Sequence, residues 1–150
     1  TNVPMEAIVT PLAEGGEIYN QLTSEEHQSG CTSSCYDCIR DYSNQNVHSI
    51  LDWRMGLDIA RLANSEKATI DFSVPYWHNY IFSTIKNMLE SNRYTVEEKQ
   101  GTLIGNDPYG EKYVLVHPLW SDEYIASISR KIGTGYKPLS VFGITKLRND

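Results

Sequence analysis

Residues 31–42 contain all three cysteines of the chain, and they read Cys31-Thr32-Ser33-Ser34-Cys35-Tyr36-Asp37-Cys38-Ile39-Arg40-Asp41-Tyr42. Cysteines separated by three and then two residues let one turn present soft thiolate ligands to a single ion, as zinc sites require. A disulfide scaffold would instead spread an even number of cysteines along the chain. The cluster therefore predicts a metal site in a reducing compartment, and the expected location is cytoplasmic.

The fourth metal ligand is not fixed by the cysteine spacing. Zn²⁺ takes four ligands in a tetrahedron, so three cysteines leave one position open. His48 and His27 flank the cluster, and His48 is preferred because it leads into a predicted helix that would hold its ring in place. His27 and a water molecule remain alternatives. The predicted cofactor is thus zinc, with Cys31, Cys35, Cys38 and His48 as its ligands.

Two other interpretations of the cysteines stay open. The spacing Cys-x3-Cys-x2-Cys also matches the iron–sulfur motif of radical enzymes that cleave S-adenosylmethionine, which would make the chain an iron–sulfur enzyme fragment. Those enzymes carry an aromatic residue where Asp37 stands, and too few residues follow Cys38 to complete their β/α barrel. The remaining interpretation is a loop of packed, metal-free thiols.

The residues on both sides of the cluster predict a loop–helix module over residues 1–66. Upstream, we expect an extended segment at 7–9, a Gly15-Gly16 turn, a short helix at 17–22 and a loop over 23–38. Downstream, a helix is expected over 49–63. Its apolar, core-facing stripe is predicted to consist of Leu51, Met55, Ile59 and Leu62. Zinc would fasten the loop to this helix.

Residues 67–150 predict a small helix–strand–strand–helix–strand layer, which places the chain in the α/β class. The expected elements are a strand at 69–74, a helix at 77–90, extended segments near 94–96, 103–104 and 113–116, a helix from 121, and a last strand at 139–144. Asn106 to Gly110 form a turn by composition. An alternative for this half is a degenerate restriction-endonuclease-like core.

A metal-dependent nuclease is the alternative function. Restriction-endonuclease-like enzymes hold Mg²⁺ with an Asp on one strand and a Glu-x-Lys on the next, because phosphodiester hydrolysis needs a metal-bound water and a positioned cation. Residues 97–99, Glu-Glu-Lys, contain the second element. Asp71 could supply the first, although a whole predicted helix lies between them, whereas Asp107 comes too late in the chain. The simpler interpretation of residues 97–99 is a solvated strand end.

Residues 34–52 carry a more specific pattern than the cysteine spacing. Ser34 to Tyr42, followed by Asn44-Gln45, His48 and Leu51-Asp52, resembles the MZB-type zinc-binding domain at the C-terminus of DEAD/DEAH-box helicases. In that family a Gly-Gly turn followed by Tyr and Leu precedes the cysteines; the matching residues here are Gly15, Gly16, Tyr19 and Leu22. The match covers about residues 11–62. Ser29 stands where the family has the first of its four cysteines.

The resemblance implies a non-catalytic accessory domain of a DNA-directed helicase used in DNA repair or in bacterial defence against phage. Its partner would be the upstream ATP-driven motor of the parent protein, and DNA would be reached through that parent. The sequence has no Gly-x4-Gly-Lys-Ser/Thr loop and no Asp-Glu-Ala-His box, so we do not expect this chain to hydrolyse ATP. Because it begins with Thr1, a C-terminal fragment of a larger protein is expected.

The charge of the chain argues against autonomous binding of nucleic acid. The net charge is −6, whereas proteins that grip DNA or RNA unaided usually present a basic face. Phosphate contacts are therefore expected only beside a partner, and the candidates are Arg40, Arg54 and Arg61. No apolar run approaches the ~20 residues that span a bilayer, so no membrane partner is expected.

Overall fold

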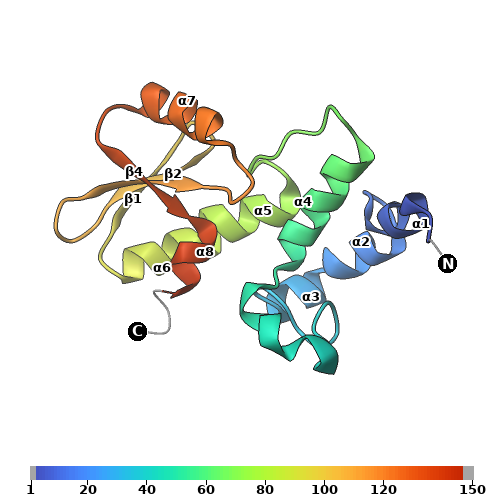
Figure 1. Cartoon of the computed structure of the whole chain (residues 1–150). Helices are drawn as coiled ribbons and strands as arrows, with labels where there is room; N and C mark the ends of the chain where they lie inside the picture. The colour runs from blue at the N-terminus through green and yellow to red at the C-terminus, as the bar shows by residue number, and fades with distance from the viewer. Residues whose placement is uncertain (1–2, 147–150) are drawn as a thin grey trace. The chain divides into compact units, whose positions relative to one another are not determined.

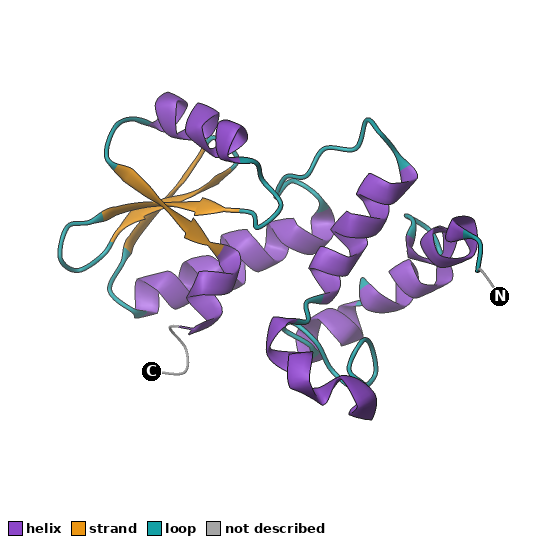
Figure 2. Ribbon diagram, in the orientation of Figure 1, coloured by secondary structure: helices purple, strands orange, loops and turns teal. Residues whose placement is uncertain are grey.

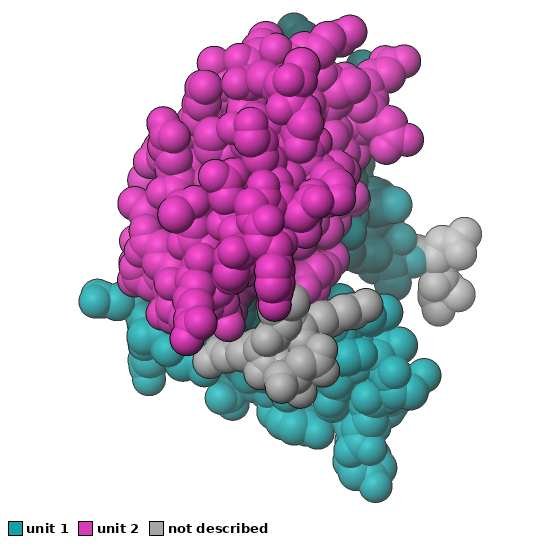
Figure 3. Space-filling view, turned by 90° about the vertical axis from the view of Figure 1, so that its left-hand side faces the viewer, with its two compact units in different colours: residues 1–69 teal, residues 70–150 magenta. Residues whose placement is uncertain are grey.

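The computed structural model describes residues 3–146, and the side chains of residues 3–144. The chain divides into two compact units, residues 1–69 and 70–150 (Figure 3), which we call unit 1 and unit 2. The sequence-based boundary lies three residues earlier, between 66 and 67. Each unit has its own core and is described by itself.

Unit 1 consists of helices and loops, with no strand in its described part (Figures 1 and 2). Its elements are α1 (Met5–Val9), the 3₁₀ turn η1 (Thr10–Leu12), α2 (Glu17–Leu22), α3 (Glu25–Gly30), the 3₁₀ segment η2 (Tyr42–Ile50) and α4 (Trp53–Asn64). Two expectations were wrong, because residues 7–9 are helical and the expected loop over 23–38 contains α3. Ser24 caps α3 by accepting a hydrogen bond from the His27 amide, and acidic residues occupy its first turn, which favours a helix despite the polar sequence.

Helix α4 supplies three of the six buried hydrophobic residues in the described part of unit 1, but through a different face from the one expected. The side chains of Trp53, Leu57 and Ala60 are buried, whereas Ile59 and Leu62 are 55% and 44% exposed. The two sets of positions lie on opposite sides of a helix, since each residue advances about 100°. The inward side also carries the buried residues Arg54 and Asp58. The expected helix at 49–63 therefore exists, but it begins at residue 53 and its core stripe was wrong.

Unit 2 combines helices with one sheet. Its elements are α5 (Pro75–Asn79), the π-helical segment η3 (Tyr80–Ile85), α6 (Lys86–Ser91), β1 (Thr95–Lys99), β2 (Thr102–Asn106), β3 (Lys112–Val116), α7 (Asp122–Ile132), β4 (Tyr136–Ser140) and α8 (Val141–Lys146). The α/β class is thus confirmed. The order is helix, three strands, helix, strand and helix, so the sheet has one strand more than expected. A tight turn at Gln100-Gly101, both with positive φ, separates β1 from β2.

Two further expectations for unit 2 were wrong. Residues 69–74 form irregular chain, because the Asp71 carboxylate accepts a 2.8 Å hydrogen bond from the Ser73 amide and closes a turn. Pro75 then begins α5 directly, at a position where a missing amide hydrogen costs nothing. The expected last strand at 139–144 ends at Ser140, after which the chain continues as α8.

The four strands lie in the order β1-β2-β3-β4, with antiparallel pairs except for the parallel pair β3 and β4. Helix α7 covers one face, and the α5–η3–α6 helix lies on the other (Figure 1). Under α7, Ile104, Val114 and Val116 pack against Ile128 and Ile132. Unit 2 is therefore a three-layer α/β/α arrangement with a closed hydrophobic core.

Candidate metal centre

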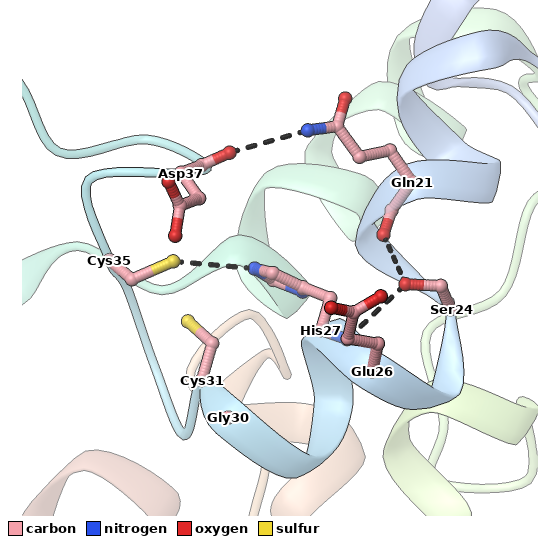
Figure 4. A pocket seen from close by; sticks show the side chains of 8 residues that line it. All are labelled: Gln21, Ser24, Glu26, His27, Gly30, Cys31, Cys35 and Asp37. Atoms are coloured by element: carbon pink, nitrogen blue, oxygen red, sulfur yellow. Dashed lines mark hydrogen bonds between the residues drawn. The ribbon is translucent and has the colours of Figure 1, made fainter.

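Four potential metal ligands converge in unit 1. The ligand atoms of His27, Cys31, Cys35 and Cys38 all lie within 4.8 Å of one another, and the described part of the chain contains no second group of three or more His, Cys, Asp or Glu that could hold an ion. Figure 4 shows His27 and Cys31, from α3 and its end, beside Cys35 from the following loop. The sequence-based prediction of a cysteine-centred cluster is thereby matched by the geometry.

The separations of these atoms fit one tetrahedral ion. The Cys38 sulfur lies 3.8 Å from the Cys31 sulfur and 3.5 Å from the Cys35 sulfur, and His27 Nε2 lies 3.6 Å from the Cys35 sulfur. Tetrahedral Zn²⁺ with its usual bond lengths separates two sulfurs by about 3.8 Å and a sulfur from a nitrogen by about 3.6 Å. With four protein ligands such a site is closed, which is typical of a structural metal rather than a catalytic one.

His27 is oriented as a ligand by its surroundings. Its Nδ1 lies 2.8 Å from the Leu22 carbonyl oxygen, and a hydrogen bond donated there leaves Nε2 unprotonated toward the sulfurs. The ring also packs edge-on against Trp53, with centroids 5.3 Å apart. Helix α3 sets the spacing, since the Cys31 amide donates to the His27 carbonyl at 2.8 Å and residues four apart share a helix face.

His48, preferred as the fourth ligand from sequence, lies elsewhere. Its Nε2 is 2.7 Å from Asn44 Oδ1 and 3.1 Å from the Asp41 carbonyl oxygen, and its ring packs edge-on against Tyr36. His48 therefore ties η2 to the preceding loop, and the preference between the two histidines is reversed. The physical reason is α3, which brings His27 to the cysteines and was not foreseen.

The Cys35–Cys38 turn supports negative charge on sulfur. The Cys35 amide donates to the Cys38 sulfur at 3.1 Å, and the amides of Cys38 and Arg40 both donate to the Cys35 carbonyl oxygen. These bonds fold the backbone around the two sulfurs. Amide hydrogens directed at sulfur stabilise a thiolate, which is the form that binds metal.

The pKa values of the three thiols differ when no cation is bound. Burial raises the pKa of Cys31 far above its usual value, and burial also raises the pKa of Cys38. Burial acts in the same direction on Cys35, but hydrogen bonds from the Cys38 and Cys31 thiols outweigh it and lower the pKa of Cys35. Three thiolates this close repel one another, so a dication is needed to ionise them together.

The loop that carries the cysteines is anchored to the start of α4. The Trp53 amide donates to the Ser33 carbonyl (2.9 Å), the Trp53 indole to that of Cys31 (3.3 Å), and the Arg54 guanidinium to that of Thr32 (2.5 Å). The guanidinium also lies over the Trp53 ring, 4.3 Å from its centroid. Three consecutive carbonyls are thus held by two residues, a connection that the sequence alone did not indicate.

The three arginines predicted to contact phosphate make contacts within unit 1. Arg54 is only 2% exposed, so its side chain belongs to the core of unit 1 rather than to a binding surface. Arg40 is partly buried and donates to Ser34 Oγ at 2.8 Å. Arg61 is paired loosely with Asp58, at 3.9 Å. None of the three arginines is fully exposed.

The nuclease residues do not assemble. Glu97 and Lys99 lie on β1, where they face Ile104 and Thr102 of β2, and Lys99 donates to the Ile132 carbonyl. Strand β2 contains no acidic residue. Asp107 follows it at the far end of the pairing and accepts hydrogen bonds from two amides of its own turn, while Asp71 caps another turn. The strand next to Glu-x-Lys therefore lacks the required carboxylate.

No protein family, curated protein or solved structure matches the chain, so the assignment of the site rests on its geometry. Within the described residues, no helix combines the length and the apolar character needed to cross a membrane. What the structure establishes is a mixed α/β chain with a Cys3His group able to hold a metal ion such as zinc.

Proposed function

We propose that unit 1 binds one structural Zn²⁺ ion through Cys31, Cys35, Cys38 and His27. The observation that carries the proposal is the set of sulfur–sulfur and sulfur–nitrogen separations of 3.5–3.8 Å. The bond from His27 to the Leu22 carbonyl supports it, because a zinc-bound imidazole usually donates its other nitrogen to an acceptor. The ion would fold the cysteine loop against α4 and catalyse nothing.

The alternative of an iron–sulfur cluster is less well supported. In such a cluster each cysteine binds a different iron, so the sulfurs must stand apart around a multi-iron core. Here the sulfurs lie close enough together to bind a single ion, and His27 lies beside them as a fourth ligand, a position that the radical enzymes leave to their substrate. Metal-free thiols are also less well supported, because they would leave unexplained why three sulfurs and one imidazole nitrogen lie within 4.8 Å of one another.

We further propose that the chain is an accessory domain of a DEAD/DEAH-type helicase that acts on DNA in repair or phage defence. The support is the sequence pattern together with its placement. Leu51-Asp52 leads directly into α4, which Asp52 caps through hydrogen bonds from the amides of Arg54 and Met55. The cysteine missing at Ser29 is offset by His27, two residues earlier on α3.

The charge distribution favours contact with a partner over direct contact with DNA. Residues 1–69 contain ten acidic and four basic residues, so unit 1 carries the whole net charge of −6, while residues 70–150 contain nine of each. An acidic unit repels phosphate unless a basic partner lies between them. We therefore propose that unit 1 helps to position the parent protein and that the motor domain holds the DNA.

Metal analysis of purified variants tests the zinc site. We expect about one zinc per chain by inductively coupled plasma mass spectrometry, with His27→Ala and Cys35→Ser losing it. His48→Ala is the matched control and should keep its zinc. Iron in place of zinc, or zinc retained by His27→Ala and lost by His48→Ala, would reject the proposed ligand set.

The helicase assignment is tested by the coding region that precedes Thr1. A motor with a Gly-x4-Gly-Lys-Ser/Thr phosphate loop is expected there. Fluorescence anisotropy should also show no binding of labelled DNA to the isolated chain at moderate ionic strength. A different upstream domain, or tight DNA binding by this acidic chain alone, would contradict the proposal.

A further inference from the structure

The three cysteines of the cluster differ in how exposed they are to solvent. Cys31 is 3% exposed, whereas Cys35 and Cys38 are only partly buried. An open pocket of about 440 Å³ reaches the cluster from outside, with Cys35, Cys31 and His27 in its wall (Figure 4). A small polar oxidant such as hydrogen peroxide can therefore reach the Cys35 sulfur without unfolding unit 1.

Cys35 and Cys38 are also the pair best placed to join. Their sulfurs are 3.5 Å apart across a Cys-x2-Cys turn, so bringing them to the ~2.05 Å of a disulfide requires a movement of about 1.5 Å within one loop. Cys31 is more constrained, because its amide bonds to the His27 carbonyl and its own carbonyl accepts from Trp53. Its sulfur lies farther from that of Cys38, at 3.8 Å.

We propose that the zinc centre is a peroxide-sensitive switch, in which Cys35 and Cys38 form a disulfide and release the metal. The inference rests on the zinc site proposed above. The observations that support the switch are the open pocket at Cys35, the partial exposure of Cys35 and Cys38, and the short distance between their sulfurs.

The reaction balances with hydrogen peroxide as the oxidant. The Cys35 thiolate attacks one peroxide oxygen, a sulfur–oxygen bond forms, and the oxygen–oxygen bond breaks to leave hydroxide, which takes a proton from solvent to become water. The Cys38 thiolate then attacks the Cys35 sulfur, forming the disulfide and expelling a second hydroxide, which is protonated likewise. The two sulfurs lose two electrons in total, and peroxide is reduced to two waters.

Zinc release follows from the ligand count. The disulfide removes two of the four ligands, so only Cys31 and His27 would remain, which is too few for a stable site. The two remaining ligands both belong to α3 and its end, so the loop over residues 32–41 would lose its metal tie to the rest of unit 1. Oxidation would then loosen this loop of unit 1, the unit that we propose positions the parent protein.

The test treats the zinc-loaded full chain with a small excess of hydrogen peroxide. A colorimetric zinc chelator reports release, and peptide mapping by mass spectrometry identifies the disulfide. We expect loss of the bound zinc in step with a Cys35–Cys38 disulfide, and rebinding after dithiothreitol and zinc are added. The same chain with chelator but no peroxide is the control, and it should keep its zinc over the same period.

Three results would overturn the switch: zinc that stays bound while peroxide is consumed, a principal disulfide that includes Cys31, or cysteines driven to sulfinic acid without a disulfide. Trapping with dimedone during oxidation should label Cys35 in preference to Cys38, and the reverse preference would also count against it. If the reduced chain never binds zinc, the proposed function fails first. A chain that binds zinc but resists peroxide rejects the switch alone.

Discussion

The indole nitrogen of Trp53 donates a hydrogen bond to the carbonyl oxygen of Cys31, a cluster residue 22 positions earlier in the chain, over 3.3 Å. The same indole is fully buried in the core of unit 1 and packs edge-on against the His27 ring. One side chain thus contacts two of the four candidate ligands and also supplies much of the local core. Metal binding and folding of unit 1 are therefore expected to be coupled.

Trp53→Phe tests this coupling. Phenylalanine keeps much of the ring but removes the donor to Cys31, and the smaller side chain leaves a small void. We expect unit 1 to lose about 1–3 kcal/mol of stability in urea unfolding followed by circular dichroism. Zinc affinity should fall as well, because the Cys31 carbonyl is no longer fixed.

Trp120→Phe is the matched control for that experiment. The Trp120 indole donates to the Ile70 carbonyl at 2.6 Å within unit 2, so the substitution removes a comparable bond away from the metal centre. It should destabilise unit 2 and leave zinc affinity unchanged. Equal effects of the two substitutions on zinc affinity would show that Trp53 does not act through the cluster.

Removal of zinc should affect the two units differently. If the ion supplies folding energy to the cysteine loop, a strong chelator will destabilise unit 1 and leave the four-stranded core of unit 2 intact. Hydrogen exchange should then accelerate over residues 31–64 and stay slow in β2 and β3. Uniform acceleration in both units, or none in unit 1, would contradict a structural metal confined to unit 1.

The cysteine spacing was sufficient to predict the cluster, but not its fourth member. His27 lies on a helix of six residues in a polar stretch, where no apolar periodicity indicates a helix. The available signal was local: Ser24 is a good N-cap, two glutamates follow it, and His27 stands four residues before Cys31. A preference for ligands next to a long helix favoured His48 instead.

The core of α4 was mispredicted because buried charge has no signature in hydropathy. Arg54 and Asp58 are almost fully buried. The assumption that charged residues face solvent therefore placed the predicted core on the opposite face of the helix. The Arg54 guanidinium lies over the ring of its neighbour Trp53 and donates to the Thr32 carbonyl, a contact that depends on a loop 22 residues away. In unit 2, β3 and α7 were easier to predict, since one is rich in β-branched residues and the other is amphipathic.

Zinc affinity should depend steeply on pH. Because the pKa values of Cys31 and Cys38 are raised by burial, both thiols keep their protons at neutral pH without metal and must release them when zinc binds. Protons therefore compete with zinc, and affinity falls as pH falls. With at least two protons released, the association constant should change by about 100-fold per pH unit. Calorimetry in buffers of different ionisation enthalpy measures the proton count, and a count near zero would mean that the thiols are already ionised.

Asp52 stands at the start of α4, and the effect of its charge on the stability of unit 1 can be tested. Its carboxylate caps α4, and burial raises its pKa despite the opposing effect of Arg54. A raised folded-state pKa means that the stability contributed by this group is full below the unfolded-state pKa and is lost as pH rises through the folded-state value. Asp52→Asn keeps a capping oxygen without the charge, so its stability relative to the natural chain should increase across that pH window.

Asp52→Ala separates the cap from the charge. Alanine cannot accept the amide hydrogens of Arg54 and Met55, so we expect Asp52→Ala to be about 1 kcal/mol less stable than Asp52→Asn at every pH, seen as a lower urea midpoint. Loss of the cap would also let the first turn of α4 fray, which weakens the bonds from Trp53 and Arg54 to the cysteine loop and lowers zinc affinity. If Asp52→Asn were as destabilising as Asp52→Ala at neutral pH, the carboxylate charge itself would be stabilising, and the raised pKa assigned to Asp52 would be wrong.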